Sequence, residues 1–196
     1  TLMDHAIIDV LVDRLNGLMP RTAIVLGSGP GSLVDEVTDP IRIPYAEIPG
    51  FPASAVSGHA GEVVAGYLGG QPILMLAGRV HYYEQGNANA MRPAIEALAG
   101  IGVQSLILTN AAGSVRQDMP PGSVMQITDH INYSGMNPLI GEESDSRFVG
   151  MTSAYDADLS IAMRNAAIRA TVPLFSGVYM WFSGPSFETP AEIRMA

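Results

Sequence analysis

The segment GRVHYYEQG (78–86) combines a cation, an imidazole and aromatic rings within a few residues. It follows the apolar run PILML (72–76), whose pattern predicts a strand. If the chain stays extended beyond that strand, Arg79, His81 and Tyr83 share one face. An arginine and a hydrogen-bond donor suit a phosphate group, and a sugar can pack on a flat ring. The alternative is a solvated loop that exposes the arginine and the histidine.

Three loops rich in glycine or other small residues each follow a predicted strand. They are GSGPG (27–31), NAAG (110–113) and SGPS (183–186). In open α/β sheets, ligands bind beyond the carboxyl ends of the strands, and small residues there let backbone N–H groups approach an anion. Each loop alone could be a tight turn without a ligand. A dinucleotide fingerprint at GSGPG is disfavoured, because Ser32 stands where the third glycine is needed, and the absent P-loop spacing excludes a P-loop.

The third loop continues into Phe187 and Glu188, directly before a predicted helix. A phenylalanine can stack on a heterocycle, and a carboxylate can accept hydrogen bonds from ring N–H and amino groups. The simpler interpretation is that Glu188 occupies a helix N-terminus, where a carboxylate is favoured in any protein. His59, taken alone, is typical of a structural histidine whose hydrogen bonds are satisfied.

Alternating strands and helices predict an α/β fold: a single domain over residues 1–196, with a central mixed, largely parallel sheet flanked by helices. The expected elements are helices at 4–17, 88–99 and 157–170, strands at 22–26, 61–68, 72–76, 104–109, 123–128 and 178–182, and a loop at 138–150. A further helix, with Thr189 as its N-cap, begins only a few residues before Ala196. We therefore expect that the chain lacks its C-terminal part.

Composition narrows the classes of function. The 196 residues are 47% hydrophobic and 15% charged, with a formal net charge of -9 and no cysteine. Such an acidic chain is a poor candidate for binding nucleic acid or an anionic membrane. Without cysteine there is neither a disulfide nor a thiolate, and no second histidine or carboxylate stands at a useful spacing for a metal. We predict a cytoplasmic protein with no metal site.

Taken together, these segments resemble the purine nucleoside phosphorylases, in the trimeric branch that prefers 6-oxopurines. The segments that carry the resemblance are GSGPG (27–31), IPGFP (48–52), SGHAGE (57–62), AGRVHYYEQG (77–86), TNAAGS (109–114), TDHIN (128–132), NPLIG (137–141) and SGPSFET (183–189). They are collinear and cover nearly the whole chain. The resemblance implies a nucleoside phosphorylase-like fold, a homotrimer, and no cofactor, with inorganic phosphate as co-substrate.

The resemblance also assigns roles to residues. It implies that phosphate is bound by Ser28, His59, Arg79, His81 and the backbone of Ala111. It implies that the nucleoside is bound by Tyr83, Asn110, Ala111, Ala112, Gly113, Phe148, Tyr179, Phe187 and Glu188. The reaction is assigned to His81, Tyr83, Glu84 and Glu188, with Phe187 on the purine and Glu188 accepting from N1–H.

The chain also departs from the family pattern. A base-site asparagine, a phosphate-binding serine and a histidine at the ribose 5′-hydroxyl would lie beyond residue 196. The loop at 138–150 looks shortened, which affects the register of Phe148, the candidate for a ring that reaches a neighbouring subunit. Ser114 stands where many relatives have glycine.

The implied reaction is the reversible phosphorolysis of inosine or guanosine to a free purine and ribose 1-phosphate. Three alternatives remain. A methylthioadenosine phosphorylase is disfavoured by Glu188, which an adenine edge would leave unpaired. A catalytically silent phosphate- or nucleoside-binding module stays open. An NAD-binding oxidoreductase is disfavoured by Ser32.

Overall fold

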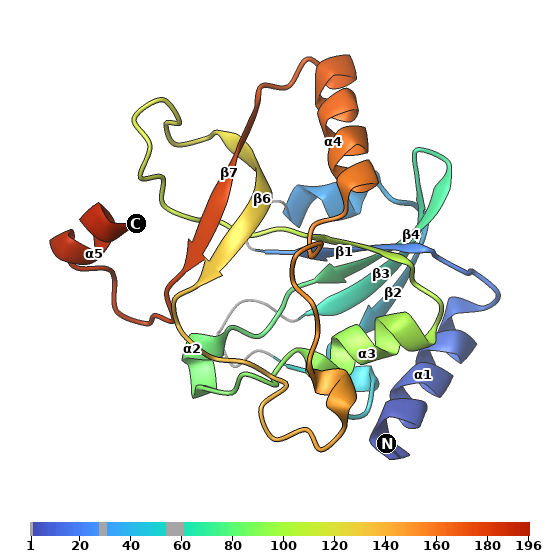
Figure 1. Ribbon diagram of the computed structural model, residues 1–196. Coiled ribbons are helices and arrows are strands. Elements are labelled where there is room, and N and C mark those ends of the chain that lie inside the picture. The colour runs from blue at the N-terminus through green and yellow to red at the C-terminus, as the bar shows by residue number, and fades with distance from the viewer. Residues whose placement is uncertain (1, 28–30, 54–60) are drawn as a thin grey trace. The chain divides into compact units, whose positions relative to one another are not determined.

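The structure, a computed structural model, describes residues 2–27, 31–53 and 61–196, and it divides into two compact units (Figure 1). The first unit extends to Ala111 and the second begins at Ala112. The first contains α1 (Leu2–Leu15), β1 (Thr22–Leu26), η1 (Gly31–Glu36), β2 (Thr38–Pro44), η2 (Tyr45–Glu47), β3 (Glu62–Leu68), β4 (Gln71–Ala77), α2 (Tyr82–Gln85), α3 (Arg92–Gly100) and β5 (Ser105–Leu108). The second contains β6 (Val124–Asn132), η3 (Asp145–Arg147), α4 (Ala157–Ala170), β7 (Leu174–Trp181) and α5 (Pro190–Met195).

The first unit is built on a five-stranded mixed sheet with the order β2-β3-β4-β1-β5. β1 is parallel to both β4 and β5, whereas β3 is antiparallel to β2 and β4. Because parallel strands end at the same edge, the chain leaves β1, β4 and β5 side by side. The sheet therefore gathers the segments that follow Leu26, Ala77 and Leu108.

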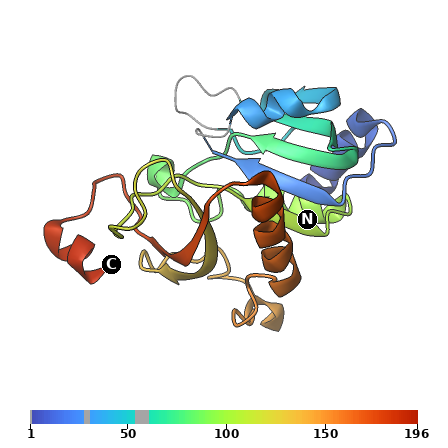
Figure 2. The ribbon, with the colours of Figure 1, turned by 90° about the horizontal axis from the view of Figure 1, so that it is seen from above.

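Alternation along β1 explains how this sheet is covered on both faces. Ala23 and Val25 belong to one buried cluster, with side chains of α1 and α3, while Ile24 and Leu26 belong to another on the opposite face. Successive residues of a strand point to opposite faces, so the uninterrupted apolar run is typical of a strand buried on both sides. Figure 2 shows α1 and α3 on one side of the sheet and η1 on the other.

The second unit pairs β6 and β7 in parallel, with a register irregularity between Ile127 and Asp129. The amide of Gln126 on β6 donates to the Ser160 carbonyl of α4 at 3.0 Å. α5 begins with a reciprocal capping box, in which Thr189 accepts from the backbone of Glu192 and donates its own N–H to that carboxylate. This is the helix start that the sequence predicts.

The predicted α/β fold with a mixed sheet and flanking helices is confirmed. The predicted strand at 22–26 and the helix at 157–170 coincide with β1 and α4, and β3 and β4 form the expected hairpin. β2 was not predicted, because its sequence TDPIRIP contains two prolines, which a sheet tolerates at an edge such as this one. The single domain over 1–196 stays a prediction.

Of the helices in the described part of the chain, none is long and apolar enough to cross a bilayer.

Candidate functional site

Arg79 lies where the three parallel strands of the first unit end. Its guanidinium donates a hydrogen bond to the carbonyl oxygen of Thr109, the first residue after β5. It also lies against Gly27, the first residue after β1, because a Cβ on that glycine would stand 3.0 Å from the Arg79 Nη2. Residues that follow β1, β4 and β5 therefore meet around one cation. This is the arrangement expected of an anion site at the carboxyl edge of a sheet.

His81 lies close enough to this cation for the positive charge to act on it, although the segment does not keep the extended form that the sequence suggested. The condition for a shared face, an extended segment, is not met beyond His81, because Tyr82–Gln85 form the single helical turn α2. Glu84 stabilises this turn by accepting the His81 N–H at 2.8 Å. The His81 and Tyr83 rings nevertheless stack, with centroids 4.9 Å apart and planes within 7°.

The surroundings of His81 favour its neutral form. Burial lowers the pKa of His81 first, and the positive charge of Arg79 lowers it further, while Glu84 opposes the shift. A neutral imidazole offers one N–H donor and one acceptor. His81 can therefore donate one hydrogen bond to a phosphate oxygen without carrying a second positive charge beside Arg79.

Tyr45 supports this edge from within the core. Its ring is 5% exposed, and its hydroxyl donates to the carbonyl oxygen of Gly78 at 2.7 Å. Gly78 immediately precedes Arg79, so this bond fixes the backbone from which the guanidinium extends. Burial, and secondly the charge of Glu62, raise the pKa of Tyr45 above its ordinary value. The hydroxyl therefore stays protonated and remains a donor.

The structure describes only some of the other residues that are predicted to bind phosphate. Ser28 and His59 lie outside the described residues. Asn110 and Ala111 directly follow Thr109 and are exposed. They end the first unit, so their backbone stands at the same edge of the sheet as Arg79.

The residues predicted for the nucleoside base belong to the second unit. Ala112 and Gly113 are exposed at its beginning, and Tyr179 lies half-buried on β7, opposite His130 in the register. Phe187 is 94% exposed. Glu188 is half-buried and immediately precedes the N-cap residue of α5, so the simpler interpretation of its carboxylate fits this position as well.

Phe148 follows η3 and is 73% exposed. The guanidinium of Arg147 lies 4.8 Å from the centre of its ring. The ring of Phe148 is therefore displayed on the surface of the second unit. Its predicted role at a neighbouring subunit stays a prediction.

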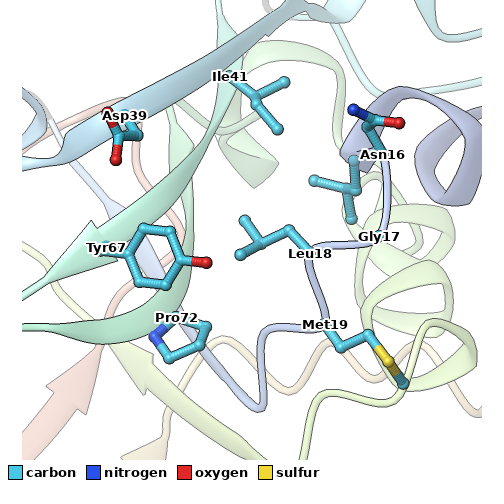
Figure 3. A pocket seen from close by; sticks show the side chains of 9 residues that line it. Asn16, Gly17, Leu18, Met19, Asp39, Ile41, Tyr67 and Pro72 are labelled. Carbon is cyan, nitrogen blue, oxygen red and sulfur yellow. The ribbon is translucent and has the colours of Figure 1, made fainter.

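A pocket of about 510 Å³ lies at the opposite edge of the first unit's sheet (Figure 3). Its lining comes from the end of α1, the turn after it and three strands, namely Leu15, Asn16, Gly17, Leu18, Met19, Asp39, Ile41, Tyr67 and Pro72. Tyr67 and Pro72 pair where β3 turns into β4, which is the end of β4 remote from Arg79. None of the predicted site residues lines this pocket.

Within residues 2–27, 31–53 and 61–196, no group of three or more histidine and carboxylate side chains could hold a metal ion.

Two residues that support the site were missed by the sequence reasoning. Thr109 ends an apolar run and resembles any β-branched strand residue, and Tyr45 stands in an unpredicted segment. The signal for Thr109 was its position, since it is a hydroxyl directly between a predicted strand and a small-residue loop. The signal for Tyr45 is visible only in three dimensions, because its partner Gly78 is 33 residues away.

Comparison with known proteins places this geometry in a family. Residues 21–196 match the Phosphorylase superfamily. Purine nucleoside phosphorylase 1 of Bacillus subtilis is 45% identical over 178 residues, which are 89% of this chain and 66% of that protein. Purine nucleoside phosphorylase of Mycobacterium tuberculosis is 39% identical over 187 residues, covering 95% of this chain and 67% of that one. The chain thus spans about two thirds of the length of these relatives.

The fold agrees with this sequence similarity. The crystal structure of purine nucleoside phosphorylase from Schistosoma mansoni, in complex with acetate, superposes with a TM-score of 0.91 at 33% identity. That alignment covers 99% of this chain and 74% of the other. The chain belongs to the purine nucleoside phosphorylase family, within the phosphorylase superfamily.

Proposed function

We propose that this protein catalyses the reversible phosphorolysis of purine nucleosides, with inorganic phosphate held at Arg79 and His81. The observation that carries the proposal is the meeting of Arg79 with Gly27 and Thr109, at the carboxyl ends of β1, β4 and β5. A cation fixed beside backbone groups and a neutral histidine suits an oxyanion. Family membership supplies the reaction that uses this anion.

In the proposed reaction, a phosphate oxygen forms a bond to the anomeric carbon while the bond from that carbon to the purine nitrogen breaks. The electron pair of the broken bond leaves with the purine, which takes up a proton at that nitrogen, while monohydrogen phosphate gives up its proton on becoming the sugar ester. The products are the free base and ribose 1-phosphate. Positive charge grows on the sugar in an oxocarbenium-like state, as in glycoside hydrolysis, so an anion fixed beneath it stabilises the transition state.

The neighbouring residues take supporting roles in this proposal. Arg79 and His81 bind and orient phosphate, and Tyr83, whose ring is 47% exposed beside His81, offers a flat surface to the ribose. Glu84 is a positioning residue, because its carboxylate holds the backbone N–H of His81. Ser28, His59 and the backbone of Ala111 complete the phosphate site as the resemblance implies.

For the base, we propose that Phe187 packs on the purine and that Glu188 accepts a hydrogen bond from N1–H of a 6-oxopurine. Asn110, Ala112, Gly113, Phe148 and Tyr179 are the further contacts that the resemblance implies. Adenine presents a lone pair at N1, which would leave a carboxylate unpaired at a cost of about 1–3 kcal/mol. The Schistosoma mansoni enzyme has been solved both with inosine and with adenosine, so binding alone does not decide the preference.

The test is phosphate-dependent release of base by the protein from inosine, guanosine, adenosine and methylthioadenosine. We expect hypoxanthine and guanine to be released only when phosphate is present, with ribose 1-phosphate as the second product. Faster cleavage of adenosine or methylthioadenosine would refute the 6-oxopurine preference. Release in water alone would refute phosphorolysis, and binding of phosphate without turnover would indicate the silent module.

Variants separate the two halves of the proposal. Arg79→Ala should chiefly raise the KM for phosphate, whereas Glu188→Gln should lower the turnover of inosine and guanosine with little effect on folding. Glu36→Gln, which neutralises an exposed carboxylate of η1, is the control. Phosphate dependence unchanged in Arg79→Ala would disprove the assigned role.

The homotrimer and the cytoplasmic location stay predictions that rest on the resemblance and the composition.

A further inference from the structure

Thr109 occupies the point where the hydrogen-bonded pairing of β1 and β5 stops. The last pair in that register is Val25 with Leu108. Beyond it, the Thr109 N–H donates to the Val25 carbonyl at 3.2 Å, and the Thr109 hydroxyl donates to the same oxygen at 2.8 Å. The side chain thus continues the contact between the two strands after their ladder has ended.

The same hydroxyl also receives a bond. The backbone N–H of Gly27 donates to the Thr109 Oγ1 at 3.3 Å. A hydroxyl can donate and accept at once, so one oxygen joins Val25 and Gly27, on either side of the last residue of β1. This pair of bonds fixes the direction in which the chain leaves β1 toward the glycine-rich loop.

The backbone of Thr109 reaches the third strand. Its carbonyl oxygen accepts the guanidinium of Arg79, which follows β4, and that guanidinium packs against Gly27. A planar guanidinium presents its donors in a fixed fork, so a bond to one N–H sets the direction of the others. Thr109 therefore contacts both the cation and Gly27, which lies against that cation.

We infer that Thr109 is a positioning residue for phosphate, which sets the Arg79 guanidinium and the start of the glycine-rich loop in one relative orientation. This inference rests on the proposed function. Thr109 does not need to touch the anion, because it acts through Arg79 and Gly27. Threonine suits the role because its branched Cβ restricts the rotamer, which keeps Oγ1 between the two backbone groups.

The test compares Thr109→Val, which keeps the shape and removes the hydroxyl, with Thr109→Ser, which keeps the hydroxyl. Losing hydrogen bonds that orient a binding group should raise the KM for phosphate about tenfold in Thr109→Val and leave the KM for inosine within about twofold. Thr109→Ser should stay near the wild-type value. Thr38→Val is the matched control, since it removes a hydroxyl that donates to the Tyr67 carbonyl at 3.2 Å, between β2 and β3 of the same sheet.

Calorimetric titration with inorganic phosphate gives a second readout that does not need turnover. If the wild type is active and Thr109→Val has the same KM for phosphate, the inferred role of Thr109 is wrong but the proposed function stands. So would equal losses of phosphate affinity in Thr109→Ser and Thr109→Val. A wild type that binds phosphate without turnover would refute the proposed function. The ratio of the phosphate affinities of the wild type and Thr109→Val would still test the role of Thr109. If Thr109→Val does not fold, weakened phosphate binding by Thr109→Ser overturns the inference and retained binding supports it.

Discussion

Replacing Gly61 by alanine should disturb the support beneath Arg79 through a collision inside the core. Gly61 immediately precedes β3, and a Cβ there would lie 2.2 Å from both Cδ2 and Cε2 of the Tyr45 ring. Carbon atoms in contact normally stand about 3.5–4.0 Å apart, so more than an ångström must be made up. The ring or the backbone of β3 must therefore move.

The ring has little freedom to move. Tyr45 is 5% exposed, its hydroxyl is bonded to Gly78, and its ring packs on Phe51 with centroids 4.6 Å apart. Overpacking of a core costs about 1–3 kcal/mol, and the displaced hydroxyl adds about 1 kcal/mol for the lost hydrogen bond. We expect Gly61→Ala to lower the free energy of unfolding of the first unit by about 2–4 kcal/mol.

Hydrogen exchange of the backbone amides of β3 and β4 measures this loss within the first unit. A loss of about 2–4 kcal/mol corresponds to a fall in protection of roughly 30-fold to 1,000-fold. Gly150→Ala is the control, because nothing lies within 4 Å of a Cβ at that glycine and its φ is not in the left-handed region. In a Tyr45→Leu background, the penalty of Gly61→Ala should largely disappear. A Gly61→Ala protein as well protected as Gly150→Ala would refute the reasoning.

Two further predictions concern Arg79 and His81, at the carboxyl edge of the first unit's sheet. Gly27→Ala should raise the KM for phosphate in kinetic assays with little change in thermal stability, because its Cβ would displace the Arg79 guanidinium, whose Nη2 lies 3.0 Å away. His81, whose pKa is lowered from 6.5 by burial and by Arg79, should make the protein less stable as the pH falls below about 6.5, since the unfolded chain then binds a proton that the folded chain resists. In urea unfolding at a series of pH values, the free energy of unfolding should fall less steeply with falling pH in His81→Gln than in the wild type. Equal slopes in the two proteins would contradict the shifted pKa.

Elements whose local sequence has a clear strand or helix pattern could be predicted. Elements whose conformation depends on contacts with other parts of the fold could not. TAIVL is a β-branched and apolar run that glycine ends, so the bounds of β1 were predicted to the residue. α2 escaped prediction because a single turn has too few residues for a helical period, and its stability comes from the bond between Glu84 and His81. β2 escaped because its edge position, which tolerates its prolines, depends on strand order.

The same division applies to the candidate site. Arg79 and His81 could be proposed from their types and from their place directly after a predicted strand, since ligands of α/β sheets bind beyond the carboxyl ends of strands. The contacts that orient Arg79 could not, since they join residues from β1, β4 and β5, and Thr109 stands 84 residues from Val25. Such contacts depend on strand order and register, which local pattern does not determine.

The distribution of buried side chains leads to a last prediction. Every buried apolar residue among the described residues lies between Ile7 and Leu98, so the described core belongs to the first unit. β6 and β7 of the second unit form a two-stranded parallel pair, and parallel sheets draw their stability from cover on both faces. In this chain of 196 residues, amides of β1, β3 and β4 should therefore exchange far more slowly than those of β6 and β7. Equal protection of the amides in the two units would contradict this prediction. It would show that contacts outside the second unit stabilise β6 and β7, and the proposed role of Glu188 would then have to be tested with those contacts present.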